Sequence, residues 1–383
     1  MKLKKAAAFS LAVLLTISCL PVSASALTND EVNAPSAVLV EANTGKTLFE
    51  KNPHEKRCCA SITKVMTLLL VMEAIDSGKI GLDDTVTASD HASSMGGSQI
   101  WLKSGETMTV DDMLKATVIA SANDTATALA EYVAGSEDEF VKQMNEKAKK
   151  LQMNDTTFKN CNGLDEDGHL TSANDVAIMS RELIKHDKIF KYTKVWIDYL
   201  RGGKTQLVNT NKLVKYYDGI TGLKTGTTGK AGSCISATAE RNGVSLIAVV
   251  LGSSNTKDRF AAARTLLDYG FANWEVAEPA VPETARLPVS VSNGMEPQVQ
   301  TDVTKSGSIL VPKGRAKDVK SSVTTDKNVK APVKEGQSVG KVVFTLDGKT
   351  LKEYGICAKN DVAEITFRAS FGLLFKNLIN MGA

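Results

Sequence analysis

The chain has 383 residues, of which 43% are hydrophobic and 23% charged, and this composition is typical of a globular protein long enough for two domains. Its formal net charge of +3 equals the three lysines at its N-terminus, so the remainder has no basic excess and we expect no nucleic-acid partner. The cysteines form no disulfide pattern and the four histidines lack metal-ligand spacing, so we expect free or buried thiols and neither a metal nor another cofactor.

Residues 1–26 have the pattern of a secretory signal peptide. Three lysines precede an apolar run, and small residues follow it up to Ala26. A lipoprotein signal through Cys19 is the weaker interpretation, because Thr16 stands where such signals usually carry leucine. We therefore expect cleavage after Ala26, export, and a location at the outer face of the cytoplasmic membrane.

The segments after this leader predict a β-hairpin and then a buried helix. Residues 35–50 contain two short runs of strand-forming residues joined by an Asn-Thr-Gly-Lys turn. Residues 58–72 are apolar on nearly every side, which indicates a helix in the middle of a domain. The first turn of this helix nevertheless carries a hydroxyl and an amine.

These two groups, on Ser61 and Lys64, form a candidate catalytic pair. Their spacing places both side chains on one face of a helix. A lysine whose ammonium is costly to bury can lose its proton near neutral pH and become the base that a serine nucleophile needs. The helix N-terminus adds free N–H groups for a developing oxyanion. The pattern alone is weak, because Ser254 and Ser338 also begin Ser-x-x-Lys runs, in polar surroundings typical of a surface.

Two further helices follow, and a second motif lies between them. Thr109 is a predicted N-cap with acidic residues in the first turn after it, and the second helix covers about residues 124–133. Ser121 and Asn123 form a Ser-x-Asn pattern at the junction. The pattern occurs twice more in the chain, once at Ser172, where we expect a helix cap.

The next region predicts the main sheet. Residues 219–227, 233–239 and 244–252 have the pattern of three successive strands, and residues 259–269 that of a helix. Together with the first hairpin they predict an α+β fold, in which helices cover both faces of a largely antiparallel sheet.

The first of these strands carries the third motif, Lys224-Thr225-Gly226, which occurs once in the chain. A strand edge with a lysine, a hydroxyl and a glycine can bind a peptide carboxylate and leave room for a substrate backbone. Alone, the motif would also fit an ordinary surface strand.

The C-terminal part differs in composition. Prolines around residues 278–288 mark a boundary, so we expect a catalytic domain over residues 27–277. Residues 278–362 predict a small β-rich domain, because short alternating runs of valine, threonine and lysine dominate them. Residues 363–383 predict an amphipathic helix that is too short to span a bilayer and could either lie on a membrane surface or dock on the β domain.

The three motifs, taken in this order, resemble the signature of penicillin-binding proteins and class A β-lactamases. Within that group, nearly the whole chain resembles the low-molecular-mass penicillin-binding proteins that are serine-type D-alanyl-D-alanine carboxypeptidases. The segments that carry this resemblance are Ala60–Thr67, Ser94–Ser98, Ser121–Asp124, Asn162–Asp165 and Gly222–Gly226. The resemblance implies the penicillin-binding, β-lactamase-like transpeptidase fold, followed by the small β domain and the amphipathic tail.

The resemblance also implies roles for individual residues. Ser61 would form the acyl-enzyme, Lys64 would accept its proton, and Ser121 would pass a proton to the departing D-alanine. The asparagine of the second motif would hold the substrate amide, the lysine and threonine of the third would bind the terminal carboxylate, and two backbone N–H groups, one of them that of Ser61, would form the oxyanion hole. The implied substrate-binding residues are Asn123, Lys224, Thr225, Gly226 and Thr227, the last as the second oxyanion donor.

The implied substrates are peptidoglycan stem pentapeptides that end in D-Ala-D-Ala. β-Lactam antibiotics would act as inhibitors that acylate the same serine, and the C-terminal helix would bring the enzyme to a membrane surface. The adjacent cysteines 58 and 59 depart from the family pattern, and we interpret them as packing residues.

Two other functions remain as alternatives. A class A β-lactamase would need a Glu-x-x-Leu-Asn segment that the chain lacks, and Glu166 is interpreted as loop surface. A catalytically inactive envelope scaffold is the second alternative, and the intact set of three motifs argues against it.

Overall fold

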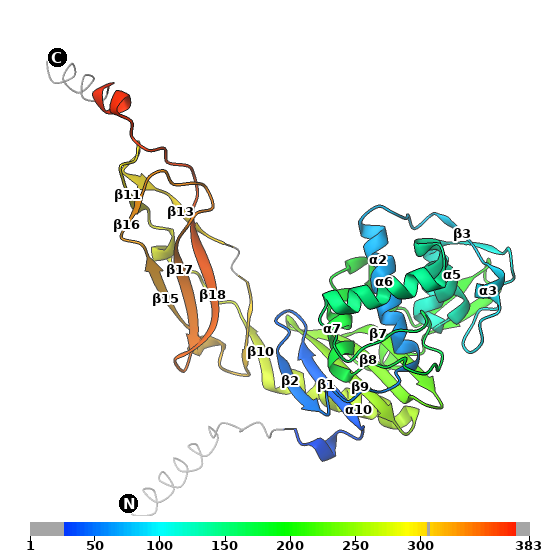
Figure 1. The fold of residues 1–383 in the computed structure, drawn as a ribbon. Coiled ribbons are helices and arrows are strands. Elements are labelled where there is room, and N and C mark those ends of the chain that lie inside the picture. Colours follow the sequence, from blue (N-terminus) through cyan, green and yellow to red (C-terminus); the bar gives the residue numbers. More distant parts are fainter. Residues whose placement is uncertain (1–26, 305–306, 373–383) are drawn as a thin grey trace, which may run out of the picture. The chain divides into compact units, whose positions relative to one another are not determined.

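The computed structural model describes residues 27–304 and 307–372, and contacts among them divide the chain into two compact units. The first unit runs to Glu240 and resumes over Ser245–Asn273, and the second takes Arg241–Val244 and the chain from Trp274 (Figure 1). The predicted signal peptide lies outside the described residues.

A five-stranded sheet with the strand order β2-β1-β9-β8-β7 forms the centre of the first unit. The strands β2 and β9 both run antiparallel to β1, and β7 runs antiparallel to β8. The hairpin and the three later strands therefore join one sheet, as the sequence predicted. The strands are β1 (Ser36–Glu41), β2 (Thr47–Lys51), β7 (Ile220–Thr228), β8 (Gly232–Arg241) and β9 (Val244–Ser253).

Helices cover both faces of this sheet. Val38 and Val40 of β1 point into the core that contains α2 and α7, whereas Leu39 between them approaches Gly270 of α10. Because successive side chains of a strand point to opposite faces, α7 and α10 lie on opposite sides of β1. The sheet with helices on both faces confirms the predicted fold class (Figure 1). The longer helices are α2 (Lys64–Asp76), α5 (Asn123–Ala134), α6 (Glu137–Lys150), α7 (Ala173–Leu183) and α10 (Thr256–Asn273).

Shorter elements connect these helices and shape the site. Thr109 caps α4 as predicted, because its side chain accepts a hydrogen bond from the backbone N–H of Asp112. The helices among them are η2 (Asn29–Glu31), η3 (Ala60–Thr63), α3 (Asp90–Ser93), α4 (Val110–Lys115), η4 (Ala116–Ala120), η5 (Asp187–Ile189), α8 (Phe190–Thr193) and α9 (Leu213–Tyr216). The short strands are β3 (Thr85–Thr87), β4 (Thr107–Thr109), β5 (Ile197–Leu200) and β6 (Thr205–Val208).

The predicted helix over residues 58–72 begins later than expected. Ala60 has a φ of 51°, a left-handed conformation that an α-helix cannot contain. Residues 58–60 are therefore excluded from the helix, the chain forms the 3₁₀ turn η3, and the α-helix α2 starts at Lys64. Ser61 thus lies on η3, one turn before Lys64.

The second unit is built from short strands, and its elements agree with the predicted β-rich region. One sheet has the order β13-β18-β17-β15, and residues of alternating burial along β17 place Val342 and Phe344 in its core. The elements are β10 (Trp274–Ala277), η6 (Glu283–Arg286), β11 (Val289–Ser292), β12 (Gln298–Val299), β13 (Thr301–Val303), β14 (Ile309–Pro312), η7 (Ala316–Asp318), β15 (Lys320–Thr325), β16 (Asn328–Lys330), β17 (Ser338–Leu346) and β18 (Lys349–Ala358).

The predicted C-terminal helix over residues 363–383 starts later in the structure. The carbonyl of Ala363 accepts a hydrogen bond from the backbone N–H of Met295, and the N–H of Ile365 donates to the carbonyl of Asn293. These bonds hold the first residues of the segment in extended form, and helix is described only from 367 to 372. The remainder of the segment lies outside the described residues. Within the described ranges, every helix is too short or too polar to cross a bilayer.

Candidate active site

Lys64 lies at the centre of the residues that the first two motifs contribute. Its Nζ is 2.9 Å from Ser61 Oγ, 2.5 Å from Asn123 Oδ1 and 2.6 Å from the backbone carbonyl oxygen of Asn162. Two of these neighbours are carbonyl oxygens, which can only accept hydrogen bonds, so they occupy two N–H groups of the amine. The serine hydroxyl can also donate, and a neutral Lys64 presents its lone pair to that hydroxyl.

The environment of Lys64 favours this neutral form. The side chain is completely buried in the first unit, and burial lowers the pKa of Lys64 to about 7, although the nearby Cys161, Asp124 and Cys59 act in the opposite direction. A large share of the lysine is therefore unprotonated at neutral pH. A buried amine in hydrogen-bond contact with a serine hydroxyl is the arrangement that general-base activation of serine requires.

A second buried lysine comes from the third motif. Lys224 lies on β7, and its Nζ donates to Ser121 Oγ at 2.7 Å and to the carbonyl oxygen of Thr225 at 2.9 Å. Burial, with further contributions from Lys64 and Arg259, lowers the pKa of Lys224 well below its ordinary value. No carboxylate pairs with this lysine among the residues that the structure describes. A buried amine with only neutral partners is well suited to receive an anion.

Ser121 and Asn123 connect the two lysines. Ser121 has a φ of 62° and follows η4, a single π-helical turn that ends the preceding helix. This conformation directs the serine toward Lys224, while Asn123, at the start of α5, reaches Lys64. The amide nitrogen of Asn123 also donates to the carbonyl of Gly96 at 2.6 Å, which holds the loop over residues 95–98 beside the site.

The strand β7 approaches the backbone of Ser61 so closely that only glycine fits at residue 226. A Cβ there would lie 2.6 Å from the carbonyl oxygen of Cys59 and 2.9 Å from the backbone nitrogen of Ser61. Since β7 is an edge strand of the sheet, one side of its backbone has no neighbouring strand. The threonines that flank Gly226 are held in place, because Thr225 Oγ1 donates to Thr210 Oγ1 and Thr227 Oγ1 bonds to the carbonyl of Gly226.

The structure thus brings all eight predicted site residues to one place, and it adds residues that the motifs did not identify. The carbonyl of Asn162 is one, because it binds Lys64 directly. Arg259 of α10 is another, since its guanidinium donates to the carbonyl of Gly226 and to Thr227 Oγ1, both at 3.0 Å. The sequence shows the Asn-Gly turn at residue 162 but not which way its carbonyl points, and an arginine inside a helix pattern carries no signal of its own.

The other copies of the motifs lie away from this cluster. Ser254 and Ser338 are exposed, and Ser172 caps α7 by accepting a hydrogen bond from the N–H of Asp175. Glu166 is exposed as expected, its carboxylate accepts a hydrogen bond from Asn160, and its backbone carbonyl accepts one from the N–H of His169. Cys59 is buried, and burial raises the pKa of its thiol to about 12, so this cysteine is a packing residue with no thiolate character.

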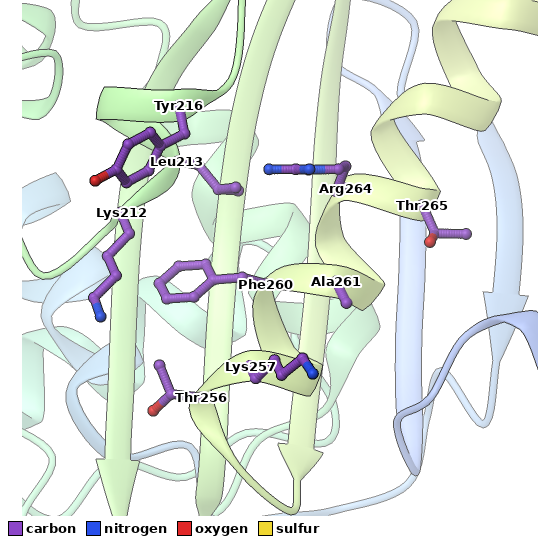
Figure 2. Close-up of a pocket in the computed structure, with 9 residues that line it drawn as sticks. All are labelled: Lys212, Leu213, Tyr216, Thr256, Lys257, Phe260, Ala261, Arg264 and Thr265. Atoms are coloured by element: carbon purple, nitrogen blue, oxygen red, sulfur yellow. The ribbon is translucent and has the colours of Figure 1, made fainter.

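A separate hollow of about 640 Å³ lies between α9 and α10 (Figure 2). It contains none of the motif residues, and Figure 2 shows cationic side chains and aromatic rings around it. Its lining residues are Lys212, Leu213, Tyr216, Thr256, Lys257, Phe260, Ala261, Arg264 and Thr265. We assign it no part in the chemistry of Ser61.

The fold and the paired serine–lysine groups define a penicillin-binding enzyme of the active-site serine class. The chain belongs to the D-alanyl-D-alanine carboxypeptidase family of S11 peptidases, whose family model matches residues 23–255. A second model, for the C-terminal domain of penicillin-binding protein 5, matches residues 283–364. The resemblance drawn from the motifs is thereby confirmed, and the protein is a serine-type D-alanyl-D-alanine carboxypeptidase.

Individual relatives agree with this assignment. The D-alanyl-D-alanine carboxypeptidase DacF of Bacillus subtilis is 46% identical over 338 residues, which cover 87% of each chain. The crystal structure of penicillin-binding protein 5 from Haemophilus influenzae superposes with a TM-score of 0.77 at 31% identity, covering 88% of this chain and all of that chain. Penicillin-binding protein D2 of Listeria monocytogenes, solved in an ampicillin-bound form, is 32% identical with a TM-score of 0.58 and covers 64% of this chain and all of its own. Neither alternative function gains support from these similarities.

Proposed function

We propose that the enzyme removes the terminal D-alanine from peptidoglycan stem pentapeptides through an acyl-enzyme on Ser61. The observation that carries this proposal is the contact of Ser61 Oγ with the buried amine of Lys64, whose pKa is lowered to about 7. Lys64 takes the hydroxyl proton while Oγ forms a bond to the carbonyl carbon between the two D-alanines. Water then attacks the ester and releases the tetrapeptide.

The oxyanion of each tetrahedral intermediate is held by the backbone N–H groups of Ser61 and Thr227. The close approach of Gly226 to the Ser61 nitrogen supports this role, because it sets the two backbone segments at a fixed separation. Two preorganised N–H donors stabilise the developing negative charge without reorganising during the reaction.

The third motif binds the substrate's C-terminal carboxylate. Lys224 has no carboxylate partner in the described residues, and Thr225 adds a hydroxyl beside it. The incoming carboxylate supplies the missing negative charge and raises the pKa of Lys224 again, so this lysine binds as an ammonium. Ser121, bonded to Lys224, passes a proton to the amine of the departing D-alanine, and Asn123 holds the substrate amide.

β-Lactam antibiotics acylate Ser61 in this proposal, as the ampicillin-bound form of the Listeria relative suggests for its own site. Intact-protein mass spectrometry after incubation with penicillin tests the assignment. Wild type should gain one stable adduct, and Ser61→Ala should gain none. Ser254→Ala is the matched control, because Ser254 also begins a Ser-x-x-Lys run but is exposed, and it should still form the adduct.

Other results would count against the proposal. An adduct that persists in Ser61→Ala would place the nucleophile elsewhere. Penicillin consumed without any adduct would favour a β-lactamase, and intact penicillin without an adduct would favour an inactive scaffold. Release of D-alanine from a pentapeptide then measures the reaction itself.

We propose further that the chain is exported by its N-terminal signal and attached to the membrane surface by its C-terminal helix. Phe367 is 87% exposed, and its ring stacks on that of Phe371 with centroids 6.4 Å apart. Two aromatic rings one turn apart on an exposed helix form an apolar face suited to a membrane interface. Co-sedimentation with anionic lipid vesicles should be lost when the chain ends at Thr366, and equal binding of both forms would contradict the anchor.

A further inference from the structure

Trp101 is held away from the protein by its own backbone. The residue is 73% exposed and has a φ of 54°, whereas its neighbours Ile100 and Leu102 are buried. The N–H groups of both neighbours donate to the carboxylate of Asp124, at 3.1 and 3.0 Å to the same oxygen. Because the amides on either side are tied to one buried acid, the indole ring is fixed in an outward position.

A groove of about 840 Å³ runs beside this ring. Its other wall is the β5–β6 hairpin. Arg201 of this hairpin donates to the carbonyl of Ile100 at 2.9 Å and to the carboxylate of Glu106 at 2.7 Å, so it holds the hairpin beside residues 100–106. Lys103, Ser104, Lys204 and Gln206 also line the groove and provide hydrogen-bond donors and acceptors. An exposed aromatic ring next to a polar groove fits a ligand that has one apolar face and a polar rim.

The groove and the residues around Ser61 are both tied to the first turn of α5, through Asp124 and Asn123 respectively. Asn123 binds Lys64 and the carbonyl of Gly96, and Trp101 follows Gly96 by five residues, a stretch that spans at most about 17 Å. The stem peptide between the attacked carbonyl and the sugar that bears it has four residues and spans up to about 14 Å. Asp124, which fixes Trp101, also directly follows Asn123 in the chain.

We infer that this groove binds the amino-sugar glycan to which the stem peptide is attached, with Trp101 stacking on the face of a sugar ring. A pyranose ring has the required combination of an apolar C–H face and a rim of hydroxyl and N-acetyl groups. The inference rests on the proposed function and deepens it, since it makes glycan-linked stem peptides better substrates than free peptides.

Release of D-alanine from two probes tests this inference. One is the free stem pentapeptide, and the other is the same pentapeptide on its N-acetylglucosamine–N-acetylmuramic acid disaccharide. Wild type should have the higher kcat/KM for the disaccharide probe, and Trp101→Ala should lower the ratio of the two kcat/KM values about tenfold. Alanine has a Cβ, as tryptophan does, so both residues pay a similar cost for the left-handed conformation at position 101. The substitution therefore removes the ring without a new effect on the backbone.

Tyr216→Ala is the matched control, because Tyr216 is 64% exposed but lines the other hollow. This variant should keep the wild-type ratio. Equal kcat/KM values of wild type for both probes would overturn the inference, and so would a loss in Trp101→Ala that is equal for both.

A second measurement separates this inference from the proposed reaction. The disaccharide without a peptide should change the tryptophan fluorescence of wild type but not that of Trp101→Phe. No change in wild type would overturn the glycan site even if D-alanine is released. A change that Trp101→Phe abolishes would support it even if neither pentapeptide is cleaved, and in that case only the proposed reaction fails.

Discussion

At the scale of single residues, the burial of Lys64 has two opposing effects. Folding buries its amine completely, which costs free energy whenever the group is charged, and the same burial favours the neutral amine that the proposed base for Ser61 needs. The carbonyl groups of Asn123 and Asn162 hold the amine in either protonation state. The fold therefore fixes where the Lys64 amine lies, and the exclusion of water from that place lowers its pKa.

The first prediction concerns the pH dependence of acylation. Because the pKa of Lys64 is lowered to about 7, the second-order rate constant for acylation by penicillin should fall about tenfold per pH unit below that value and level off above it. Stopped-flow measurements between pH 5 and 9 would test this, with circular dichroism to verify folding at each pH. A flat profile, or one that keeps rising toward pH 10, would place the base elsewhere.

The same lysine predicts a pH dependence of stability. Its pKa is about 7 in the folded chain and near the ordinary value of 10.5 in the unfolded chain, so the unfolded chain binds more protons between these values. Over this window the group makes the free energy of unfolding rise with pH, by up to about 1.4 kcal/mol per unit. Urea titrations of wild type and Lys64→Met should show a shallower rise in the variant, and equal slopes would contradict the lowered pKa.

The sequence identified the side chains of the three motifs, but not the backbone groups or the arginine that join them in the site. The spacing of Ser61 and Lys64 placed them together before any fold was known. The carbonyl of Asn162 and the guanidinium of Arg259 could not be predicted, because a backbone oxygen has no sequence signature and a buried arginine is recognised only by its surroundings.

At the scale of elements, the contact of β7 with η3 sets the position of Ser61 relative to the third motif. Gly226 allows the strand to lie against the backbone of Cys59 and Ser61. Arg259 of α10 also holds the strand, because its guanidinium donates to the carbonyl of Gly226. The site thus depends on three elements that are far apart in sequence. A small displacement of the strand would separate the substrate-binding motif from the serine.

Gly226→Ala should therefore damage both stability and acylation. The new methyl would have to displace backbone atoms, which costs about 1–3 kcal/mol, and a shift of about 1 Å in the strand should slow acylation about 100-fold. Thermal unfolding and penicillin adduct formation measure the two effects. Gly229→Ala, in the turn directly after β7, is the matched control, because a Cβ there meets no atom within 4 Å. Equal behaviour of the two variants would contradict the close approach.

Element boundaries were predictable where capping or alternation marks them. Thr109 and Ser172 begin helices as expected, because their hydroxyls accept the free N–H groups of the first turn. The turns next to Ser61 and Ser121 were not predicted. Ala60 and Ser121 adopt left-handed conformations that their residue types do not favour, and tertiary contacts hold them there.

At the scale of the whole molecule, the first unit contains every residue of the proposed site. Its main hydrophobic cluster contains residues between Val38 and Leu251, α10 adds buried residues such as Leu266 and Leu267, and the second unit has a cluster of its own. The Listeria relative covers 64% of this chain with all of its own residues, so a shorter chain of this fold exists.

A fragment of residues 27–273 should consequently fold and form the penicillin adduct at a rate within about twofold of the full chain. Circular dichroism and mass spectrometry test this directly. A fragment that ends at Thr228 lacks β8 and β9 and should remain unfolded, which makes it the negative control. Aggregation of the 27–273 fragment would show that the first unit depends on the second.

The strand order of the central sheet has a consequence for how the chain can acquire its structure. Ala37 of β1 lies opposite Val250 of β9, so a strand made at the start of synthesis pairs with one made much later. Until Ser253 has been added, β1 has a partner strand on one side only, and the backbone N–H and C=O groups along its other edge lack the strand that they pair with in the folded unit. Such distant pairings slow folding, because the intervening chain must be ordered before the contact is gained. Folding of this unit therefore cannot be completed until the chain has been made through Ser253, whereas the residues after Asn273 are not needed for it.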